Sequence, residues 1–233
     1  SKDDTSKIAH EYEEKYPTIV RAVDKENGGH GDAVNAGLDH AEGKYFKVVD
    51  GDDWVECEGF AELIQRLKNC DVDYVFTNYY EVNDVTGELT PVTFSWLKKE
   101  EKMPFEMIAN ETRISMHSLV LKTSILKENQ IRLDEHCFYV DVEYILYPIP
   151  YVQSVIYFDI FVYMYRLAQV NQSVSMLGYQ KHMQNHIDVI LHVLDYINAY
   201  KEKDDCDKLK EVYMERRIAE MTHNQVDVFT SFP

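Results

Sequence analysis

The chain has 233 residues, of which 45% are hydrophobic and 28% charged, a composition that excludes a disordered chain and allows a large buried core. Its 24 basic and 41 acidic residues give a net charge of −17, which disfavours binding to nucleic-acid phosphates. The same charge repels any other phosphorylated ligand. A protein of this composition that binds one therefore needs a local correction, such as a divalent cation held by carboxylates.

The cysteines predict a reducing compartment. There are four of them, without a Cys-x-x-Cys pair: Cys57, Cys70, Cys137 and Cys206. This pattern argues against a zinc site and against a disulfide framework, and the nine histidines suggest no zinc pair either. We expect a cytoplasmic protein that could work at the inner face of the membrane. The most apolar stretch, residues 147–165, contains two prolines and predicts two buried strands rather than a membrane span.

Hydrophobic periodicity predicts alternating helices and strands. Helices are expected over residues 8–16, 33–41, 59–69, 104–110, 123–129 and 141–147, and strands over residues 18–23, 44–49, 73–82, 89–94, 118–121 and 154–165. From residue 177 the pattern changes to two helices, one ending near residue 200 and the other covering residues 208–222. The sequence therefore predicts an α/β domain over residues 1–176 and a helical appendage over residues 177–233.

An acidic turn follows the strand expected over residues 44–49. Asp50, Asp52 and Asp53 would repel one another unless a cation or hydrogen-bond donors bring them together. The strand places the turn at the carboxyl edge of a sheet, where open α/β sheets bind their ligands. Oxygen ligands of this kind suit Mg²⁺ or Mn²⁺.

The acidic turn could also belong to a calcium loop or cap a helix. A calcium loop of the EF-hand type would need Gly at its sixth position and Glu at its twelfth, where this chain has Val55 and Ala61, so it is excluded. An acidic cap on the following helix, with Asp53 as a solvated capping residue, stays open as the alternative to a metal site.

A glycine-rich segment, residues 27–32, lies between an expected strand and an expected helix. Its glycines allow close backbone approach, and amides at a helix N-terminus could bind a nucleotide or a phosphate. The spacing matches neither a Walker loop nor a GxGxxG fingerprint. The alternative is a flexible loop with Asp32 as the helix cap.

Several segments together resemble the family 2 glycosyltransferases with a GT-A fold. In chain order they are Asp3-Asp4-Thr5, Lys25-Glu26-Asn27-Gly28-Gly29, Asn35-Ala36-Gly37-Leu38, Ala41-Glu42-Gly43-Lys44-Tyr45 and Asp50-Gly51-Asp52-Asp53-Trp54. The resemblance covers the nucleotide-binding half closely and extends more loosely to about Ser175. It implies a Rossmann-like mixed sheet flanked by helices. It also implies a metal-dependent, inverting, hexosyltransferase-like enzyme of bacterial polysaccharide or glycoconjugate synthesis.

The resemblance implies a donor and a metal site. The donor would be a nucleotide sugar, most simply UDP-linked, and the acceptor a hydroxyl of a glycan or of a lipid-linked molecule. Asp50 and Asp52 match the two aspartates of the family's DXD motif and would hold Mn²⁺ or Mg²⁺. The expected donor-binding residues are Gly28, Gly29, His30, Asp32, Asn35, Asp50 and Arg166. Val34 departs from the family, which commonly has Arg just before the residue matching Asn35.

An inverting transfer also needs a general base for the acceptor hydroxyl. Asp141 matches the family's catalytic aspartate at the start of a helix, although Val140 replaces the usual preceding Glu. Glu143 matches a frequent downstream acid, and Asp134 and Glu135 are reserve candidates. The alternative role for Asp141 is that of a helix cap.

Two further residues have open roles. The segments Tyr163-Met164-Tyr165-Arg166 and Gln172-Ser173-Val174-Ser175 resemble the family's Tyr-Arg and Ser segment near a mobile lid. Arg166 could contact a phosphate, or it could be a plain structural arginine. His117 could lie on the acceptor side, supplement the metal, or be a satisfied buried histidine.

The resemblance begins at the serine of the family's first Asp-Asp-Gly-Ser type turn, so we expect the family's first strand, helix and second strand to be missing. Such a fragment would expose a sheet edge and would be aggregation-prone or inactive. The final helices could pack on the domain, form a homo-oligomer, or contact a membrane surface or protein partner, with packing in cis the default. Two alternative functions stay open, a non-catalytic carbohydrate- or nucleotide-binding module and a nucleotidyltransferase.

Overall fold

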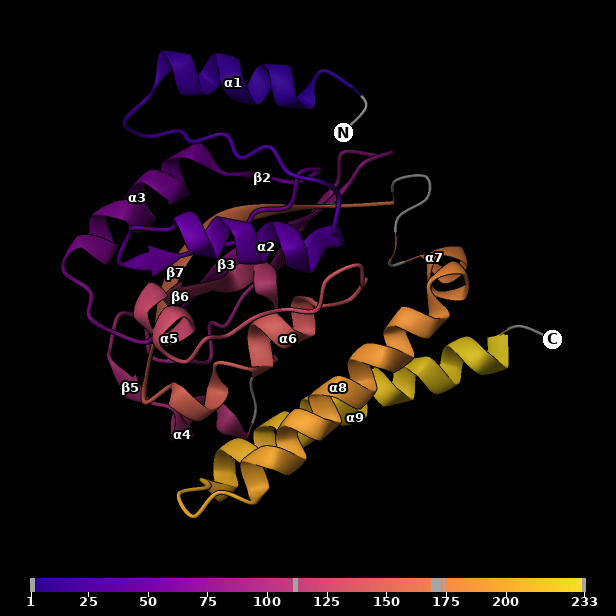
Figure 1. Cartoon of the computed structure of the whole chain (residues 1–233). Coiled ribbons are helices and arrows are strands. Elements are labelled where there is room, and N and C mark those ends of the chain that lie inside the picture. Colours follow the sequence, from indigo (N-terminus) through magenta and orange to yellow (C-terminus); the bar gives the residue numbers. More distant parts are fainter. Residues whose placement is uncertain (1–2, 111–112, 169–172, 174, 232–233) are drawn as a thin grey trace.

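The protein is described by a computed structural model that covers residues 3–110, 113–168, 173 and 175–231 (Figure 1). Within these residues seven strands form one mixed sheet of order β1-β6-β3-β7-β2, with β4 beside β3 and β5 beside β7. The strands are β1 (Tyr45–Phe46), β2 (Trp54–Val55), β3 (Tyr74–Asn83), β4 (Leu89–Val92), β5 (Met103–Pro104), β6 (Leu119–Lys122) and β7 (Ser154–Leu167). Only the pair β3 and β7 is parallel among these described strands; the other pairs are antiparallel.

Helices cover both faces of this sheet. The α-helices of the described residues are α1 (Thr5–Lys15), α2 (Gly29–His40), α3 (Cys57–Lys68), α4 (Glu106–Ala109), α5 (Thr123–Glu128), α6 (Asp141–Leu146), α7 (Met176–Lys181), α8 (Met183–Lys201) and α9 (Lys208–Ser231), with two 3-10 turns, η1 (Met116–Ser118) and η2 (Ile149–Tyr151). One face packs on α3 through a small apolar cluster that includes Leu63, Val75 and Ile156. The other face carries the larger core, to which α6, α8 and α9 contribute.

The central strands β3 and β7 are buried along most of their length, which is what a strand covered by helices on both sides requires. Their register shifts on both sides of Asn78, where three residues of β7 have no partner in β3. Asp159, one of the three, accepts hydrogen bonds from the Asn78 side chain at 2.8 Å and the Tyr157 hydroxyl at 2.7 Å, and it also pairs with Lys99. The irregularity is therefore braced by polar contacts, as β-bulges commonly are.

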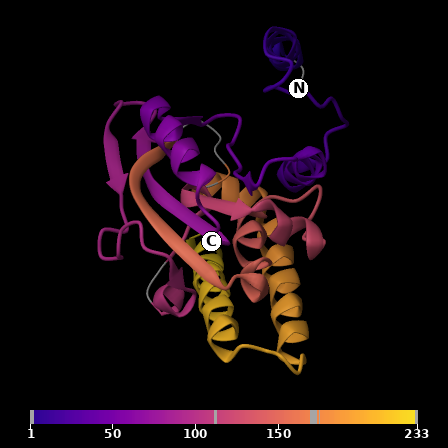
Figure 2. The same cartoon turned by 90° about the vertical axis from the view of Figure 1, so that its left-hand side faces the viewer.

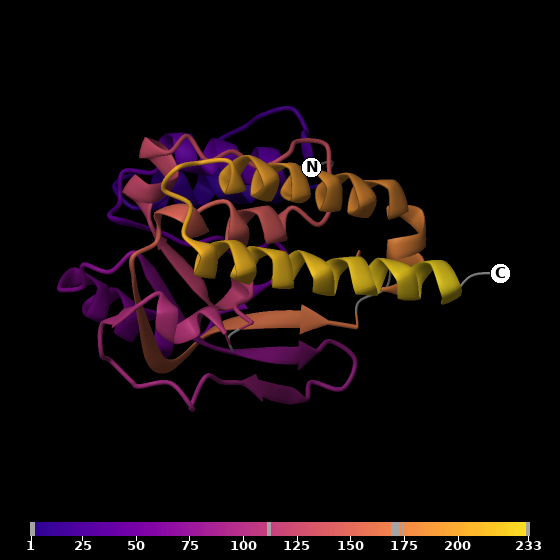
Figure 3. The same cartoon turned by 90° about the horizontal axis from the view of Figure 1, so that it is seen from below.

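Helices α8 and α9 form an antiparallel pair along the larger core (Figures 2 and 3). Val189, Val193 and Ile197 of α8 and Met214 and Ile218 of α9 are buried in the same cluster as the sheet residues. The helical region thus packs in cis against the sheet. No helix among the described residues is both long enough and apolar enough to cross a membrane.

The structure corrects four of the expected elements. Residues 18–23 form no strand, because no neighbouring strand is available to pair with them, and Ile19 is 82% exposed. Helix α2 begins at Gly29 rather than at residue 33. Residues 147–165 contain the turn η2 and a single strand rather than two strands. Helix α9 continues to Ser231, well past residue 222.

Helix α1 lies apart from the rest of the protein at the top of Figure 1 and has no buried residue. Its expected apolar stripe is present, but Ile8, Tyr12 and Tyr16 are all exposed. The hydrophobic period therefore predicted the helix correctly. Among the described residues, however, no surface packs against its apolar side chains.

Candidate functional site

The acidic turn lies at the carboxyl edge of the sheet, as expected. Strands β1, β3 and β7 point the same way, because β1 and β3 are both antiparallel to β6 while β7 is parallel to β3. The turn follows β1 and leads into β2, which pairs with the last third of β7. Its backbone closes through a hydrogen bond of 3.1 Å from the Asp53 amide to the Asp50 carbonyl.

Tyr163 of β7 holds both ends of this turn. Its hydroxyl accepts a hydrogen bond from the Asp50 amide at 3.1 Å and donates one to the Asp53 carboxylate at 2.6 Å. The other carboxylate oxygen of Asp53 accepts from the Arg166 amide at 2.8 Å. Burial raises the pKa of Asp53 to about 6, and these hydrogen bonds act in the opposite direction. Asp53 thus ties the turn to β7. It does not cap α3, whose capping residue is Glu56.

Asp50 lies beside two histidines. Its carboxylate is 3.5 Å from Nδ1 of His30 in α2. Asp50, Asp53 and His117 each offer a ligand atom within 4.8 Å of the other two, an arrangement that could hold a metal ion. Burial raises the pKa of Asp50, and Asp52 contributes to the rise while His30 opposes it. Asp52 itself is exposed at the tip of the turn.

His117 is held as a neutral ring. Burial and the nearby Lys47 lower its pKa to about 3. The ring stacks on Tyr165 with centroids 3.7 Å apart, and its buried Nδ1 has no hydrogen-bond partner among the described residues. A neutral imidazole with an unused nitrogen is the form that binds metals. His117 is therefore suited to supplement a cation bound at Asp50.

Lys47 is a partly buried lysine next to the site. Its ammonium group donates to the carbonyls of His117, at 2.8 Å, and Leu119, at 3.2 Å, and lies 5.1 Å from the Tyr163 ring centre. Burial lowers its pKa to about 7. Lys47 thus braces the segment that carries His117 and places a positive group close to the acidic turn.

Asp141 is the first residue of α6 and lies in an open pocket of about 560 Å³ that also contains His117 and Tyr165. The side chain is exposed to the pocket, yet the surrounding protein still restricts its hydration and raises the pKa of its carboxyl group. Asp50 raises this pKa further and His30 lowers it, so the three groups are electrostatic neighbours. The N-cap position of α6 is Val140, so Asp141 occupies the first helical position and is not the cap.

Two arginines line the pocket on the side of Asp141 away from the acidic turn. Arg113 and Arg217 both pair with Glu220, at 3.6 and 2.7 Å. The exposed Trp96 forms part of the same wall. An indole face and a pair of guanidinium groups are surfaces suited to a polar, sugar-bearing molecule.

The glycine-rich segment forms the start of α2 rather than a separate loop. Gly29 has a φ of +86°, which only glycine adopts readily, and the Gly28 carbonyl accepts a hydrogen bond from the His136 amide at 2.5 Å. The carboxylate of Asp32 pairs with Lys25 and lies against Gly28, which is itself the residue at the N-cap position. Asp32 is therefore not the cap of α2.

The expected donor-binding residues are thus only partly brought together. His30 and Asp50 meet beside Asp141. Asn35 is buried, and its side chain forms two hydrogen bonds of 2.9 Å with the backbone of Leu133, so it fixes α2 to the following loop. Arg166 reaches the site through its amide, while its guanidinium lies 5.2 Å from the Trp54 ring centre and 3.6 Å from Asp84. Of the lid segment, residues 172 and 174 fall outside the described residues.

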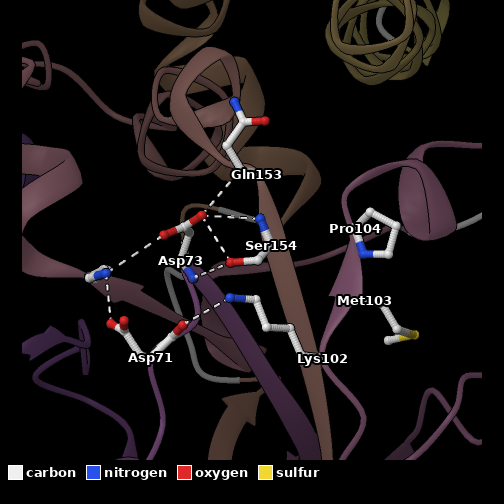
Figure 4. A pocket seen from close by; sticks show the side chains of 8 residues that line it. Asp71, Asp73, Lys102, Met103, Pro104, Gln153 and Ser154 are labelled. Atoms are coloured by element: carbon white, nitrogen blue, oxygen red, sulfur yellow. Dashed lines mark hydrogen bonds and ion pairs between the residues drawn. The ribbon is translucent and has the colours of Figure 1, made fainter.

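A second pocket of about 460 Å³ lies at the opposite, amino edge of the sheet (Figure 4). Asp73 dominates it and accepts three hydrogen bonds of 3.0 Å, from the Gln153 amide and from the amide and hydroxyl of Ser154. Lys122 pairs with Asp71 and Asp73 in the same place. These polar groups connect the starts of β3 and β7 by hydrogen bonds, so we interpret their role as structural.

Comparison with known proteins agrees with this geometry. Residues 1–129 match the profile of "Glycosyl transferase family 2", more than half of the chain. The chain therefore belongs to glycosyl transferase family 2. Over its whole length it also superposes on the crystal structure of Staphylococcus aureus TarS 1-349 in complex with UDP-GlcNAc, with a TM-score of 0.60, 19% identity and 62% of that chain covered. This likeness confirms the predicted GT-A fold.

Curated relatives share the same part of the sequence. The chain is 31% identical over 143 residues to the minor teichoic acid biosynthesis protein GgaB of Bacillus subtilis, which is 59% of this chain and 15% of that protein. It is 38% identical over 69 residues to glycosyltransferase GlyG of Streptococcus pneumoniae, 29% of this chain and 23% of that protein. Each match thus spans less than a quarter of the relative's length.

Proposed function

We propose that the protein transfers a sugar from a nucleotide-sugar donor to a hydroxyl of a glycan or lipid-linked acceptor, with inversion and with a bound divalent cation. The donor is a UDP-sugar, and the product belongs to a cell-surface polysaccharide or glycoconjugate. The observation that carries the proposal is the meeting of Asp50, His30, His117 and Asp141 at one edge of the sheet.

The residues present fit a divalent cation. Asp50 belongs both to the DXD pair expected from the sequence and to the compact group with His117. Asp53 is committed to Tyr163 and to the Arg166 amide. We therefore assign the cation to Asp50 and Asp52, with His117 as a supplementary ligand. When bound, Mn²⁺ or Mg²⁺ neutralises the diphosphate and stabilises it as the leaving group.

The side chains around the turn position the donor. His30 faces Asp50, and its buried Nε2 has no hydrogen-bond partner among the described residues, so it can donate to a phosphate oxygen. His30 belongs to the first turn of α2, so the start of this helix, with Gly28 and Gly29, lies next to Asp50. Tyr163 keeps the turn in place without reaching the ligand.

Asp141 serves as the general base. Its carboxylate accepts the proton of the acceptor hydroxyl as that oxygen forms a bond to the anomeric carbon, while the bond from this carbon to the nucleotide diphosphate breaks. Attack from the side opposite the leaving group inverts the configuration. The raised pKa of Asp141 makes it a stronger base than an ordinary aspartate, provided that the pH keeps it ionised.

Two comparisons support the choice of substrates. The similar TarS structure contains UDP-GlcNAc, which supports a UDP-linked donor. The relative GgaB is named for minor teichoic acid biosynthesis, which supports an acceptor in the cell envelope. The pocket beyond Asp141, with Trp96 and the two arginines, is where we place the acceptor.

A donor screen tests the proposal. The protein is incubated with UDP-sugars, candidate acceptors and Mn²⁺, and the release of nucleotide diphosphate is measured, with the product's anomeric configuration determined by NMR. We expect diphosphate release that chelator abolishes, loss of release in Asp50→Asn, and no loss in the control Asp71→Asn at the opposite edge of the sheet. Release of pyrophosphate instead would indicate a nucleotidyltransferase.

The second candidate function is a non-catalytic binding module. Val140, in place of the family's usual Glu before the catalytic aspartate, favours it. Such a module would bind a UDP-sugar in calorimetry without releasing diphosphate from any donor and acceptor pair, and Asp141→Asn would then change nothing.

A further inference from the structure

Three potential metal ligands from the loop before α6, from α6 and from α8 meet in one place. Asp134 precedes α6, Glu143 belongs to its first turn and His192 comes from α8. Each offers one ligand atom, and these atoms all lie within 4.8 Å of one another. The residues are up to 58 positions apart in sequence, so the fold and not local chain geometry gathers them.

Glu143 is the unexplained member of this cluster. It is 0% exposed, and its Oε2 accepts a hydrogen bond of 2.8 Å from the Asp134 amide. Its other oxygen, Oε1, is buried without a hydrogen-bond partner among the described residues. The Tyr147 hydroxyl approaches Glu143 and lowers its pKa, but it does not satisfy Oε1. A buried carboxylate oxygen without a partner is unstable unless a proton or a cation compensates it.

The local charge also favours a cation. Asp134 lies against both other residues, since its amide donates to Glu143 at 2.8 Å and its carboxylate pairs with His192. Asp188, one turn before His192 on α8, adds a further carboxylate close by. The ion-pair partner of Asp134 is His192.

We propose that Asp134, Glu143 and His192 form a second divalent-cation site, separate from Asp50, that takes Zn²⁺. One imidazole nitrogen with two carboxylate oxygens is a ligand set that Zn²⁺ commonly takes in proteins. Three protein ligands leave a fourth position for water. A cation bound here gives the buried Oε1 atom of Glu143 the partner that it lacks among the described residues, and His192 binds as the neutral ring.

A cation here would connect three parts of the protein. Glu143 lies two residues after Asp141, so the ion fixes the start of the helix that carries the proposed base. The loop that carries Asp134 also packs closely on α2: a Cβ added at Gly31 of α2 would lie only 2.0 Å from the Asp134 carbonyl oxygen. An ion that fixes Asp134 therefore also supports α2. His192 brings in α8. The role is therefore structural, and it does not depend on the transfer reaction.

Zinc titration tests the site. The parent protein carries Asp50→Asn and Asp52→Asn, which remove the expected donor-side ligands, and is stripped with chelator. Calorimetry should show one Zn²⁺ per chain, and bound Zn²⁺ should raise the unfolding temperature. His192→Ala and Glu143→Gln in this parent should each weaken binding by at least about tenfold, since even lost outer-shell partners of a metal cost roughly 10–100-fold.

The matched control is His223→Ala, because His223 is also an exposed helical histidine beside a carboxylate, 3.7 Å from Asp227, but lies outside the cluster. It should bind Zn²⁺ like the parent. The proposal is rejected if the parent binds no Zn²⁺, or if His192→Ala binds it as tightly as the parent. His192 is 53% exposed, so its replacement leaves the fold intact and decides the question even if Glu143→Gln does not fold.

Discussion

Replacing Tyr163 by phenylalanine should loosen the acidic turn without creating a cavity. The hydroxyl of this fully buried residue accepts from the Asp50 amide and donates to the Asp53 carboxylate. A hydrogen bond to a charged group contributes about 1.5–3 kcal/mol and a neutral one about 0.5–1.5 kcal/mol. Because Asp53 is only half-buried and water can replace part of the loss, we expect a destabilisation of about 2 kcal/mol. That corresponds to a decrease of roughly 4–8 °C in unfolding temperature for a chain of this size.

Tyr74→Phe is the matched control. Tyr74 is equally buried, in the neighbouring strand β3, but its hydroxyl has no hydrogen-bond partner among the described residues. Removing a hydroxyl that makes no hydrogen bond should leave stability unchanged within about 0.5 kcal/mol or increase it slightly. The same chemical change thus has different expected outcomes at two buried positions of one sheet.

The assays are denaturant unfolding and calorimetric binding of the UDP-sugar with Mn²⁺. If the donor binds only when the turn is ordered, the roughly 2 kcal/mol lost in Tyr163→Phe should weaken the affinity for the UDP-sugar by about 30-fold. Tyr74→Phe should bind the UDP-sugar with normal affinity. Equal stability and equal donor affinity of the two variants would refute the role of Tyr163.

Three further predictions concern the sheet and the base. Gly59→Ala should lower the unfolding free energy in urea by about 2–4 kcal/mol, because the added Cβ would lie 1.8 Å from a carbonyl oxygen of β7. Gly51→Ala, whose Cβ would have no atom within 4 Å, should leave the unfolding free energy nearly unchanged. The pKa of Asp159 is lowered to about 2, chiefly by its lysine partner, so the ionised carboxylate stabilises the fold by about 1 kcal/mol after solvent screening. This stabilisation is complete above pH 3.8 and is lost as the pH falls through 2. The difference in unfolding free energy between the protein and Asp159→Asn should therefore shrink over that range, and a constant difference would contradict it. The pKa of Asp141 is raised by burial, so the acid limb of the pH–rate profile should lie above the range of an ordinary aspartate, and an acid limb near pH 4 would count against this base.

The sequence predicts the fold well where motifs and periodicity are local. The order of helices and strands from Cys57 to Val92 and from Leu119 to Leu146 follows the expected pattern, because the segments there have a clear apolar period. The segment over residues 18–23 fails because a strand needs a partner, and no local pattern reveals whether one exists.

Only some residues of the candidate site can be predicted from the sequence. Asp50 and Asp141 are found through motifs, and the structure places them as electrostatic neighbours. Tyr163 and Lys47 escape sequence-based prediction as site residues, because their roles depend on hydrogen bonds across 113 and 70 positions of the chain. A tyrosine facing an acidic turn has no sequence signature. Lys47, which lies between the apolar residues Phe46 and Val48 of the expected strand, is a signal that the sequence does contain.

Asn35 is a residue to which the sequence assigns a binding role and the structure a structural one. The family resemblance suggested a donor contact, whereas its side chain bonds the Leu133 backbone 98 positions away. The histidine and carboxylates around Glu143 are also too far apart in sequence for a spacing rule to identify them. Such clusters become visible only when the fold brings the residues together.

The measurement that most directly tests the proposed function compares nucleotide-diphosphate release by the protein and by Asp141→Asn, with donor affinity measured on the same samples. If Asp141 is the base of an inverting transfer, release should fall by about 10²–10⁴-fold while the UDP-sugar still binds with unchanged affinity. Full release by Asp141→Asn would contradict the assignment.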